Sequence, residues 1–395
     1  MRPYSRRHRW VATRCLREVG NEQASHHSLG SLLLRTRGAY AVIRDLGRTP
    51  PRVALLSLEP WDGTWRRNQH LAAALVRASA VKDLVFVQPA SAVPPPDWRP
   101  LPGITVHTPR RRLPSRLGGN RVIGRSLRHG ALREIDLLWI NDPVLGVHSM
   151  TTAPALYDIT DDWREARASN HVVRRLVRAE DRLARRAATV VCSEVLRQRW
   201  RDRYGVEAHL VHNGVDLAAH RAAIPRKLPG KVPHVGYVGT LHDERLDVDL
   251  LVRLGGDPRI GTVHLVGPDS FSAATRARLG GVPGIVLHGP VPAAEVPDWM
   301  ASFDALMSPH LVTAFTLSLD AIKAYEYLAS GRPVVATPTS GFQELAGRVR
   351  LAAAPRFADE LVEALNGPNL DDGPPPASWE DRAREMTAII EELAR

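Results

Sequence analysis

The chain has 395 residues, of which 44% are hydrophobic and 24% charged, so it has enough apolar material for the cores of two domains and is not expected to be disordered. Lysine and arginine number 53 against 42 acids, a net charge of +11, which predicts acidic partners such as phosphates or anionic lipid. No zinc-ligand spacing or basic-aromatic motif supports binding to nucleic acid. With only two cysteines no disulfide framework is implied, and no apolar run is long enough to span a bilayer, so we expect a cytoplasmic protein.

The first 49 residues do not have the pattern of an opening strand. Arginines surround only a few apolar side chains, such as Trp10 and Leu16. A basic amphipathic helix, a disordered tail and an incorrectly chosen start codon are the alternatives for this segment.

A nucleotide-type α/β domain begins at Arg52. A buried strand there is followed by the loop Glu59–Trp65 and by a helix over residues 69–78. Arg66 and Arg67 fall in the first turn of that helix, where the helix dipole disfavours cations. They therefore serve either a bound anion or the solvated surface.

Three more short strands are expected at residues 84–87, 137–140 and 155–158. Polar residues follow the last two, in a region where α/β sheets carry their functional loops. One of these endings is Asn141-Asp142-Pro143 and the other runs from Asp158 to Trp163. Asp161 and Asp162 are either functional acids or caps of the next helix.

The segment from Val172 to Ala187 predicts a helix with one apolar and one basic face. The basic face holds Arg174, Arg175, Arg178, Arg182, Arg185 and Arg186. A strand at residues 190–193 follows, and Asn213-Gly214 is typical of a turn.

A second run of strands and helices starts with a strand at residues 234–238. Gly236 and Gly239 allow a close approach of the backbone to a ligand, and Arg245 follows. Asp247 and Asp249 mimic a metal-binding Asp-x-Asp motif, but acids in the first turn of a helix suit its dipole, and we favour that interpretation. Further strands are expected at residues 263–267 and 286–291.

The stretch from Ser318 to Thr337 predicts a helix, a stop and a buried strand, with an acid in an unusual place. Glu326 is in line with the apolar Leu319, Ile322 and Ala329, so its charge needs a partner. It is either a core-edge glutamate bonded to an amide or arginine, or a ligand-binding residue. After three prolines, Ser378 and Asp381 have capping-box spacing and open a last amphipathic helix.

Two motifs resemble a known family. The run Lys323-x-x-Glu326-Tyr-Leu-Ala-x-Gly331-Arg-Pro-Val-Val resembles the C-terminal signature of GT-B-fold glycosyltransferases, in particular the large retaining family four that uses nucleotide-sugar donors. Trp61-Asp62 with Arg66-Arg67-Asn68-Gln69-His70 resembles the start of teichuronic-acid and exopolysaccharide glycosyltransferases. The resemblance implies two Rossmann-like parallel-sheet domains facing a cleft, with a C-terminal helix that crosses back to the first domain.

The resemblance also places the domain boundaries, since the family's first domain ends at the Asn213–Asp216 tetrapeptide. We expect a basic extension over residues 1–49, an acceptor-side domain over 50–214, a linker over 215–232, a donor-binding domain over 233–370, and a linker with the C-terminal helix over 371–395.

The family's functional residues carry over to particular positions. Glu326 would bind the ribose hydroxyls of the donor, and Arg245 would grip the diphosphate. The chain departs from the commonest pattern at several positions: Ser318 replaces a first glutamate, Thr240 replaces a second diphosphate arginine, and Ala321 replaces a proline. The catalytic candidates are Arg245, Asp161 and Ser318. The donor candidates are Glu326, Gly239, Thr240, His288, Gly289, Val291, Leu319, Asp320 and Ile322, and the acceptor candidates are Gly63, Thr64, Arg67, Asn68 and Asp142.

The expected function is transfer of a sugar from a nucleotide-sugar donor to a hydroxyl of a cell-envelope or polysaccharide acceptor, with retention, without a metal or another cofactor. Dinucleotide, phosphate-loop, hydrolase-elbow and zinc-protease motifs do not occur in the sequence. The arginine clusters also favour attachment to the inner face of the cell membrane, beside a lipid-linked acceptor. A non-catalytic sugar-nucleotide-binding assembly partner and a same-fold epimerase are the alternatives.

Overall fold

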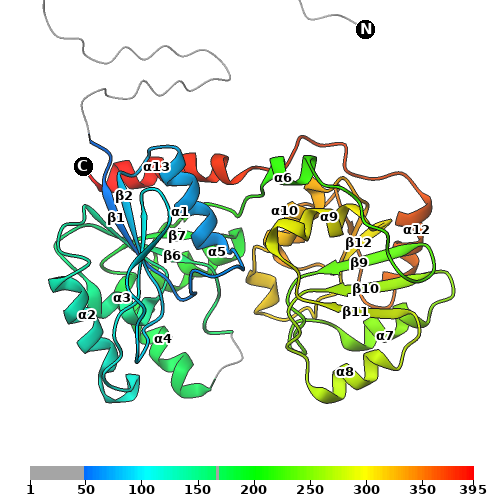
Figure 1. The fold of residues 1–395 in the computed structure, drawn as a ribbon, viewed down its shortest axis with the longest axis horizontal. Helices are drawn as coiled ribbons and strands as arrows, with labels where there is room; N and C mark the ends of the chain where they lie inside the picture. The colour runs from blue at the N-terminus through cyan, green and yellow to red at the C-terminus, as the bar shows by residue number, and fades with distance from the viewer. Residues whose placement is uncertain (1–48, 166–168) are drawn as a thin grey trace, which may run out of the picture. The chain divides into compact units, whose positions relative to one another are not determined.

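The computed structural model describes residues 49–165 and 169–395, so the alternatives for residues 1–48 lie outside the described residues. The described chain contains two sheets, each with helices on both faces (Figure 1). Both sheets are parallel except for one antiparallel pair at an edge of the first.

The first sheet has eight strands in the order β3-β4-β2-β1-β5-β6-β7-β8. Central β1 places Val53 opposite Leu84 of β2 and opposite Leu137 of β5. Its side chains alternate between two buried cores, one on each face, which is the pattern of a parallel sheet covered on both sides. The strands are β1 Arg52–Leu56, β2 Asp83–Val87, β3 Trp98–Leu101, β4 Ile104–His107, β5 Leu137–Ile140, β6 Ala155–Ile159, β7 Ala188–Val191 and β8 His209–Leu210.

Helices cover the two faces of this sheet unequally. One core is closed by α1 (Arg67–Arg77). The core on the other face includes side chains of α2, α4 and α5. These helices and the short α3 are α2 Gly119–His129, α3 Pro143–Ser149, α4 Asn170–Leu183 and α5 Glu194–Tyr204.

The second sheet has six strands in the order β11-β10-β9-β12-β13-β14 and lies between two further cores. Its strands are β9 His234–Val238, β10 Thr262–Val266, β11 Ile285–Gly289, β12 Ala305–Ser308, β13 Val334–Ala336 and β14 Arg350–Leu351. Its helices are α7 Val248–Gly256, α8 Ala273–Gly280, α9 Val296–Ala301, α10 Ile322–Ala329, α11 Ser340–Gln343 and α12 Phe357–Asn366.

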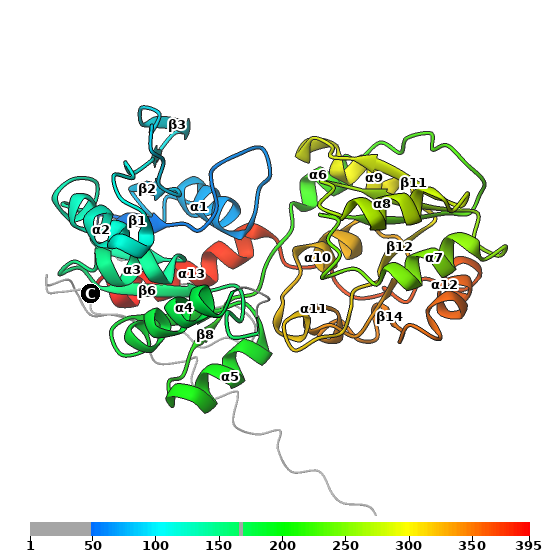
Figure 2. The same cartoon turned by 90° about the horizontal axis from the view of Figure 1, so that it is seen from below.

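The last helix, α13 (Trp379–Leu393), returns to the first sheet and lies beside α1 (Figure 1, Figure 2). Trp379, Met386 and Ile390 are buried in the core that α1 also closes. Trp379 also stacks on His70 of α1, with ring centroids 4.6 Å apart and planes at 3°. The predicted capping box is present, because Ser378 Oγ accepts from the Asp381 amide and Asp381 Oδ2 accepts from the Ser378 amide.

The predicted linker is not featureless. A short helix, α6 (Leu217–Arg221), forms inside it, and the side chain of Asp216 caps this helix by accepting from the Ala219 amide. The signature helix, α10, begins later than expected, at Ile322, and follows a single 3-10 turn over residues 316–318. No described helix combines the length and the apolar character that a membrane span requires.

Candidate functional site

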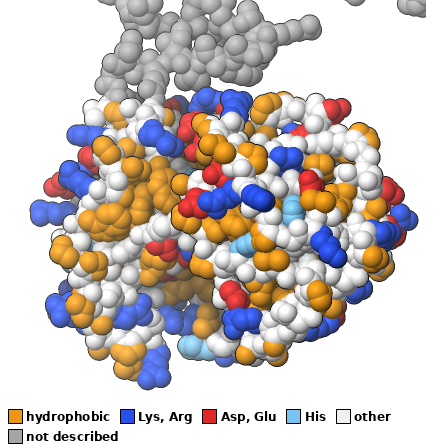
Figure 3. All heavy atoms as spheres, turned by 45° about the vertical axis from the view of Figure 1, so that its right-hand side comes forward, with side chains coloured by type: hydrophobic (Ala, Val, Ile, Leu, Met, Phe, Trp, Pro, Cys, Tyr) orange, Lys and Arg blue, Asp and Glu red, His pale blue; other side chains and the backbone are white. Residues whose placement is uncertain are grey.

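A cavity of about 840 Å³ lies where strands of the two sheets end. Its walls include Leu58 after β1, Asn141 after β5 and Gly239 after β9, in agreement with the rule that α/β sheets bind ligands outside the carboxyl ends of their strands. On the face shown in Figure 3, basic and acidic side chains are interspersed. The predicted residues that line the cavity are Gly63, Thr64, Arg67, Asn68, Asp161, Gly239, Thr240, Arg245, Val291, Leu319, Asp320, Ile322 and Glu326.

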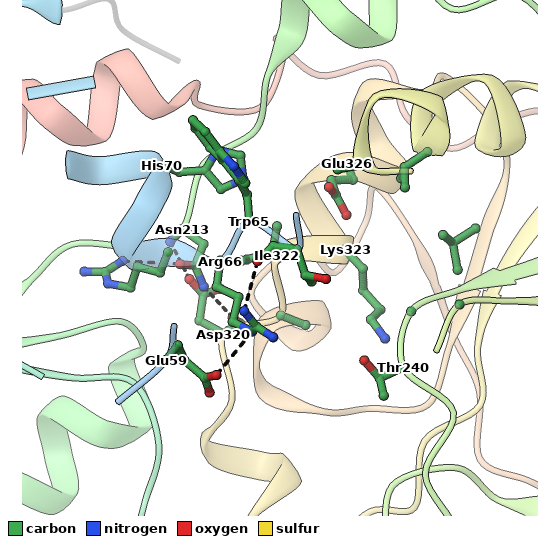
Figure 4. A pocket seen from close by; sticks show the side chains of 18 of the residues that line it. Glu59, Trp65, Arg66, His70, Asn213, Thr240, Asp320, Ile322, Lys323 and Glu326 are labelled. Atoms are coloured by element: carbon green, nitrogen blue, oxygen red, sulfur yellow. Dashed lines mark hydrogen bonds and ion pairs between the residues drawn. The ribbon is translucent and has the colours of Figure 1, made fainter. Parts of the chain in front are cut away.

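Glu326 of α10 faces this cavity and not the core (Figure 4). The apolar side of the helix is formed by Ala324, Tyr327 and Leu328, which are buried. Burial raises the pKa of Glu326 to about 7, although the nearby Lys323 ammonium acts to lower it. Within the described residues its carboxylate accepts no hydrogen bond, so the expected core-edge partner is not found and the oxygens are free to accept from a ligand.

Lys323 lies one turn before Glu326 and lines the same cavity. Its Nζ donates a hydrogen bond of 2.6 Å to the Tyr237 hydroxyl of β9. That hydroxyl lies 3.3 Å from the Thr240 carbonyl and 3.3 Å from Nε2 of His310. Burial, together with the charge of Arg245, lowers the pKa of Lys323 to about 7, although the charge of Glu326 acts to raise it. Lys323, Tyr237 and His310 are cavity residues that the sequence analysis did not assign to the site.

Arg245 comes from the loop between β9 and α7. Its guanidinium carbon lies 5.6 Å from the centroid of the Phe315 ring, and no carboxylate in the described part of the chain pairs with it. The side chain is exposed and lines the cavity, so its charge is available to an anion.

The two adjacent acids after β6 have different environments. Asp162 is buried, accepts from the Arg164 amide and forms a 2.9 Å ion pair with Arg199. Asp161 lines the cavity and accepts from the Thr160 hydroxyl. Burial raises the pKa of Asp161, while the Thr160 hydrogen bond and the charge of Arg245 act to lower it. Asp161 is therefore the acid of this pair that a substrate could meet.

The structure gives Arg67 a partner other than a bound anion. Its guanidinium is buried and forms an ion pair of 3.2 Å with Asp158 at the end of β6. It also donates to the carbonyl of His212 and to Oδ1 of Asn213. These contacts use the guanidinium to join α1 to the ends of two strands, so the expected anion contact of Arg67 is not supported.

Asp320 is likewise occupied. Its Oδ2 accepts from the Asn213 amide at 2.6 Å, and its Oδ1 accepts from the Tyr325 hydroxyl at 2.8 Å. Asn213 Nδ2 also donates to the Asp320 carbonyl. The residue borders the cavity, but its carboxylate fastens the start of the α10 segment to the last loop of the first sheet.

Four predicted site residues do not line the main cavity. Ser318 is fully buried, its hydroxyl donates to the Phe315 carbonyl, and its own carbonyl accepts from Ser193. Asp142 caps α3 by accepting from the Leu145 amide and lines a smaller cavity of about 250 Å³. His288 forms a hydrogen bond with His264, and Gly289 is the last residue of β11. The next two residues, Pro290 and Val291, do line the main cavity.

The remaining acceptor-side predictions lie at the rim and wall of the cavity. Gly63 and Thr64 are in an exposed loop, in which the Thr64 amide donates to Asp62. Asn68 is buried and donates to Ser57 and to Asn141, while its own Oδ1 has no partner. An unsatisfied buried acceptor beside a cavity could receive a hydrogen bond from a ligand.

The Asp-x-Asp sequence has a structural explanation, as favoured above. Asp247 caps α7 by accepting from the Leu250 amide, and Asp249 forms an ion pair with Arg278 of α8. Across the described residues, no group of three or more His, Cys, Asp or Glu is placed to hold a metal ion.

Residues 232–367 match a family model described as Glycosyl transferases group 1. TuaH of Bacillus subtilis (strain 168), named as a teichuronic acid biosynthesis glycosyltransferase, is 27% identical over 198 residues. That similarity covers 46% of this chain and 50% of TuaH, so the chain matches only half the length of this curated relative.

Solved structures are similar over most of the chain. Anabaena HepE, in complex with UDP and glucose, gives a TM-score of 0.61 at 15% identity and covers 87% of this chain and 97% of its own. The UDP-forming trehalose-phosphate synthase of Burkholderia vietnamiensis gives 0.61 at 14% identity, with 88% and 96% covered. These similarities confirm the predicted fold of two Rossmann-like domains.

Proposed function

We propose that this chain, a GT-B-fold protein with a group 1 glycosyltransferase domain at residues 232–367, is a sugar transferase. It transfers the sugar from a nucleotide-sugar donor to an acceptor hydroxyl. The observation that carries the proposal is the cavity at the strand ends, which unites an unbonded carboxylate, Glu326, with two cations, Lys323 and Arg245. A ribose offers hydroxyl donors to the first, and a diphosphate offers charge to the other two.

Each residue has a role in this proposal. Glu326 accepts from the ribose hydroxyls. Arg245 stabilises the diphosphate, which keeps the bonding electron pair as its bond to the anomeric carbon breaks. The helix start near Ala321 has no side-chain cap, so its free amides add to that stabilisation. Asp161, a cavity residue from the first domain, is proposed to lie near the reacting carbon. Retention at that carbon is part of the proposal and follows the family resemblance.

The acceptor is proposed to be a cell-envelope or polysaccharide glycan, presented by the first domain. TuaH, a relative of half the chain, is named for teichuronic acid biosynthesis, and HepE was solved with UDP and glucose. These names support a UDP-sugar as the first donor to try. The chemistry is proposed to need no metal, because the two cations supply the charge that a metal would otherwise provide.

The test is a thermal-shift screen of nucleotide sugars followed by assays of nucleoside diphosphate release with and without polysaccharide acceptors. A donor that stabilises the protein and releases its diphosphate supports transfer, whereas binding without release supports the assembly-partner alternative. Conversion of the donor into another nucleotide sugar supports an epimerase. Activity lost with a chelator and restored by manganese would contradict the metal-free mechanism.

A further inference from the structure

The Lys323 ammonium lies in the cavity and contacts Tyr237 of β9. Lys323 lies in the first turn of α10, and its side chain points toward Thr240 (Figure 4). The Tyr237 hydroxyl accepts its hydrogen bond at 2.6 Å, and the Nζ atom lies 4.2 Å from the centroid of the Tyr237 ring. An ammonium has three donors, so two of them remain for other partners.

The ammonium also lies against the backbone of Gly239. A Cβ atom added at Gly239 would come within 2.7 Å of the Lys323 Nζ, and the glycine has a φ of +149° that disfavours a side chain. Gly239 directly precedes Thr240, the position where the resembling family commonly has an arginine for the diphosphate. The Lys323 ammonium therefore lies beside the backbone that leads into position 240.

The charge of this ammonium is poorly balanced within the protein. No acid in residues 49–165 or 169–395 forms an ion pair with it. The carboxylate of Glu326, one helical turn away, attracts the ammonium, while the guanidinium of Arg245 repels it. Burial is the main reason that its pKa falls to about 7. The titratable and charged groups that face it from the neighbouring elements are Tyr237, His242, Arg245, His310 and Glu326.

We propose that Lys323 is the second diphosphate-binding cation of this site, held in place by Tyr237, and that it replaces the arginine absent at position 240. The inference rests on the proposed function, because it assigns a ligand group to the same cavity. A diphosphate between Arg245 and Lys323 would supply the negative charge that both lack. The Lys323 ammonium would then be fully protonated in the complex and only partly protonated in the free protein.

The first experiment measures binding of UDP, GDP and ADP, each beside its own nucleoside, by calorimetry. Lys323→Met should weaken the nucleoside diphosphate that the wild type prefers by roughly 10- to 100-fold and leave the nucleoside unchanged. Lys323→Arg should recover much of the loss, because it restores the charge. Lys231→Met is the matched control, since Lys231 is exposed and lies outside the cavity.

The second experiment repeats the titration at pH 8 in two buffers of different ionisation enthalpy. The wild type should take up close to one proton as UDP, GDP or ADP binds, and Lys323→Arg should take up much less, because arginine is already charged. A purely structural lysine would not alter this proton uptake.

The outcomes separate the two proposals. If the wild type binds none of the three nucleoside diphosphates, and neither CDP nor dTDP, the proposed function fails. If it binds one and Lys323→Met binds it equally well, or loses the nucleoside to the same extent, the assignment of Lys323 to the diphosphate is overturned while the proposed function stands. Proton uptake that is unchanged in Lys323→Arg would also overturn the assignment.

Discussion

Glu326 and Arg245 face one cavity from different elements, and their proposed ligand groups differ. The ribose contact of Glu326 is the same before and during bond breaking, so its loss should mainly weaken binding. Hydrogen bonds to a charged group contribute on the order of 1.5 to 3 kcal/mol. Glu326→Ala should therefore fold normally and lower donor affinity or turnover by roughly one to two powers of ten. Transfer at the wild-type rate would remove Glu326 from the site.

Arg245→Ala should reduce turnover more than Glu326→Ala does. Negative charge on the diphosphate grows as the glycosidic bond breaks, so Arg245 stabilises the transition state more than it stabilises the bound donor. Steady-state kinetics of both variants provide the comparison, and the expected sign is a larger loss in kcat for Arg245→Ala. Arg245→Ala with unchanged diphosphate affinity and unchanged kcat would contradict its assignment.

Which polar side chains near the cavity have protein partners could be predicted only in part, because those partners are distant in the sequence. The basic first turn suggested that Arg67 meets an anion, but Asp158, which pairs with it, lies 91 residues away. Asp320 was expected beside the donor, yet its carboxylate accepts from Asn213, 107 residues earlier. Lys323 was visible in the signature motif, three residues before Glu326, but its contact with Tyr237 depends on the packing of α10 against β9.

A chain of three histidines joins neighbouring strands of the second sheet. His264 of β10 lies 3.0 Å from His234 of β9 and 2.8 Å from His288 of β11, measured between ring nitrogens. Burial, together with the two other rings, lowers the pKa of His264 to about 4. A folded pKa below the unfolded value of 6.5 means that this stabilisation is present above pH 6.5 and is lost as the pH falls through about 4.

We therefore expect the melting temperature to fall between pH 6.5 and 4, and to fall less steeply in His264→Gln. Thermal melts across this range give the two slopes. His209→Gln is the control, because His209 is exposed, and it should keep the wild-type slope. Equal slopes in all three proteins would exclude His264 as a source of the acid sensitivity.

Secondary structure was predictable where the local pattern was strong. The strand at residues 137–140 agrees with β5, and the capping box opens α13 as predicted. The β3–β4 hairpin was not predicted, because Trp98–Leu101 lacks an alternating pattern and is largely exposed. The start of α10 was placed too early, because Ser318–Ala321 is apolar enough for a helix but is held by the contacts of Ser318 and Asp320.

The two domains of the described chain touch through a polar contact that should respond to pH. His212 of the first domain lies 3.3 Å from Glu344 and 3.7 Å from Asp320 of the second. Burial acts to lower the pKa of His212, but the hydrogen bond and charge of Asp320 and the charge of Glu344 raise it overall. The pKa of Glu344 is raised as well, because burial outweighs the opposing charge of His212.

A raised folded pKa means that the contribution of His212 is present below pH 6.5 and is lost as the pH rises through the folded value. We expect the domains to separate more readily at pH 8.5 than at pH 6, seen as a larger radius of gyration in small-angle scattering. His212→Gln should remove this dependence. A radius that is constant with pH in the wild type would show that the contact does not control opening.

Two arginine clusters of the first domain, residues 110–112 and the basic face of α4, meet at the smaller cavity, which Arg111 and Arg175 both line. Exposed Val172 lies on α4 with the second cluster, and exposed Leu117 follows the first cluster along the chain. The arginines of the N-terminal segment lie in residues 1–48, outside the described residues. Cations near an anionic leaflet contribute about 1 kcal/mol each and are screened by salt, so the two described clusters could hold this domain at a membrane surface.

Co-sedimentation with vesicles tests this attachment. Binding should rise with the anionic lipid content, fall at high salt, and weaken when Arg174, Arg178 and Arg182 are replaced by glutamine. The control replaces three arginines of the second domain, each of which pairs with an acid, by glutamine: Arg259, Arg276 and Arg278. This change removes the same amount of charge. Equal loss in both triple variants, or binding indifferent to lipid charge, would favour a soluble acceptor.

The return of α13 to the first sheet has a consequence for synthesis on the ribosome. The core that α1 closes is incomplete until Trp379, Met386 and Ile390 have been made, because these side chains are buried in it. Residues 234–351, which form the second sheet, are translated and can pair before that moment. The domain encoded first is therefore the domain completed last. Until then the apolar side chains that α13 covers beside α1 stay exposed, and we expect a chaperone to bind them.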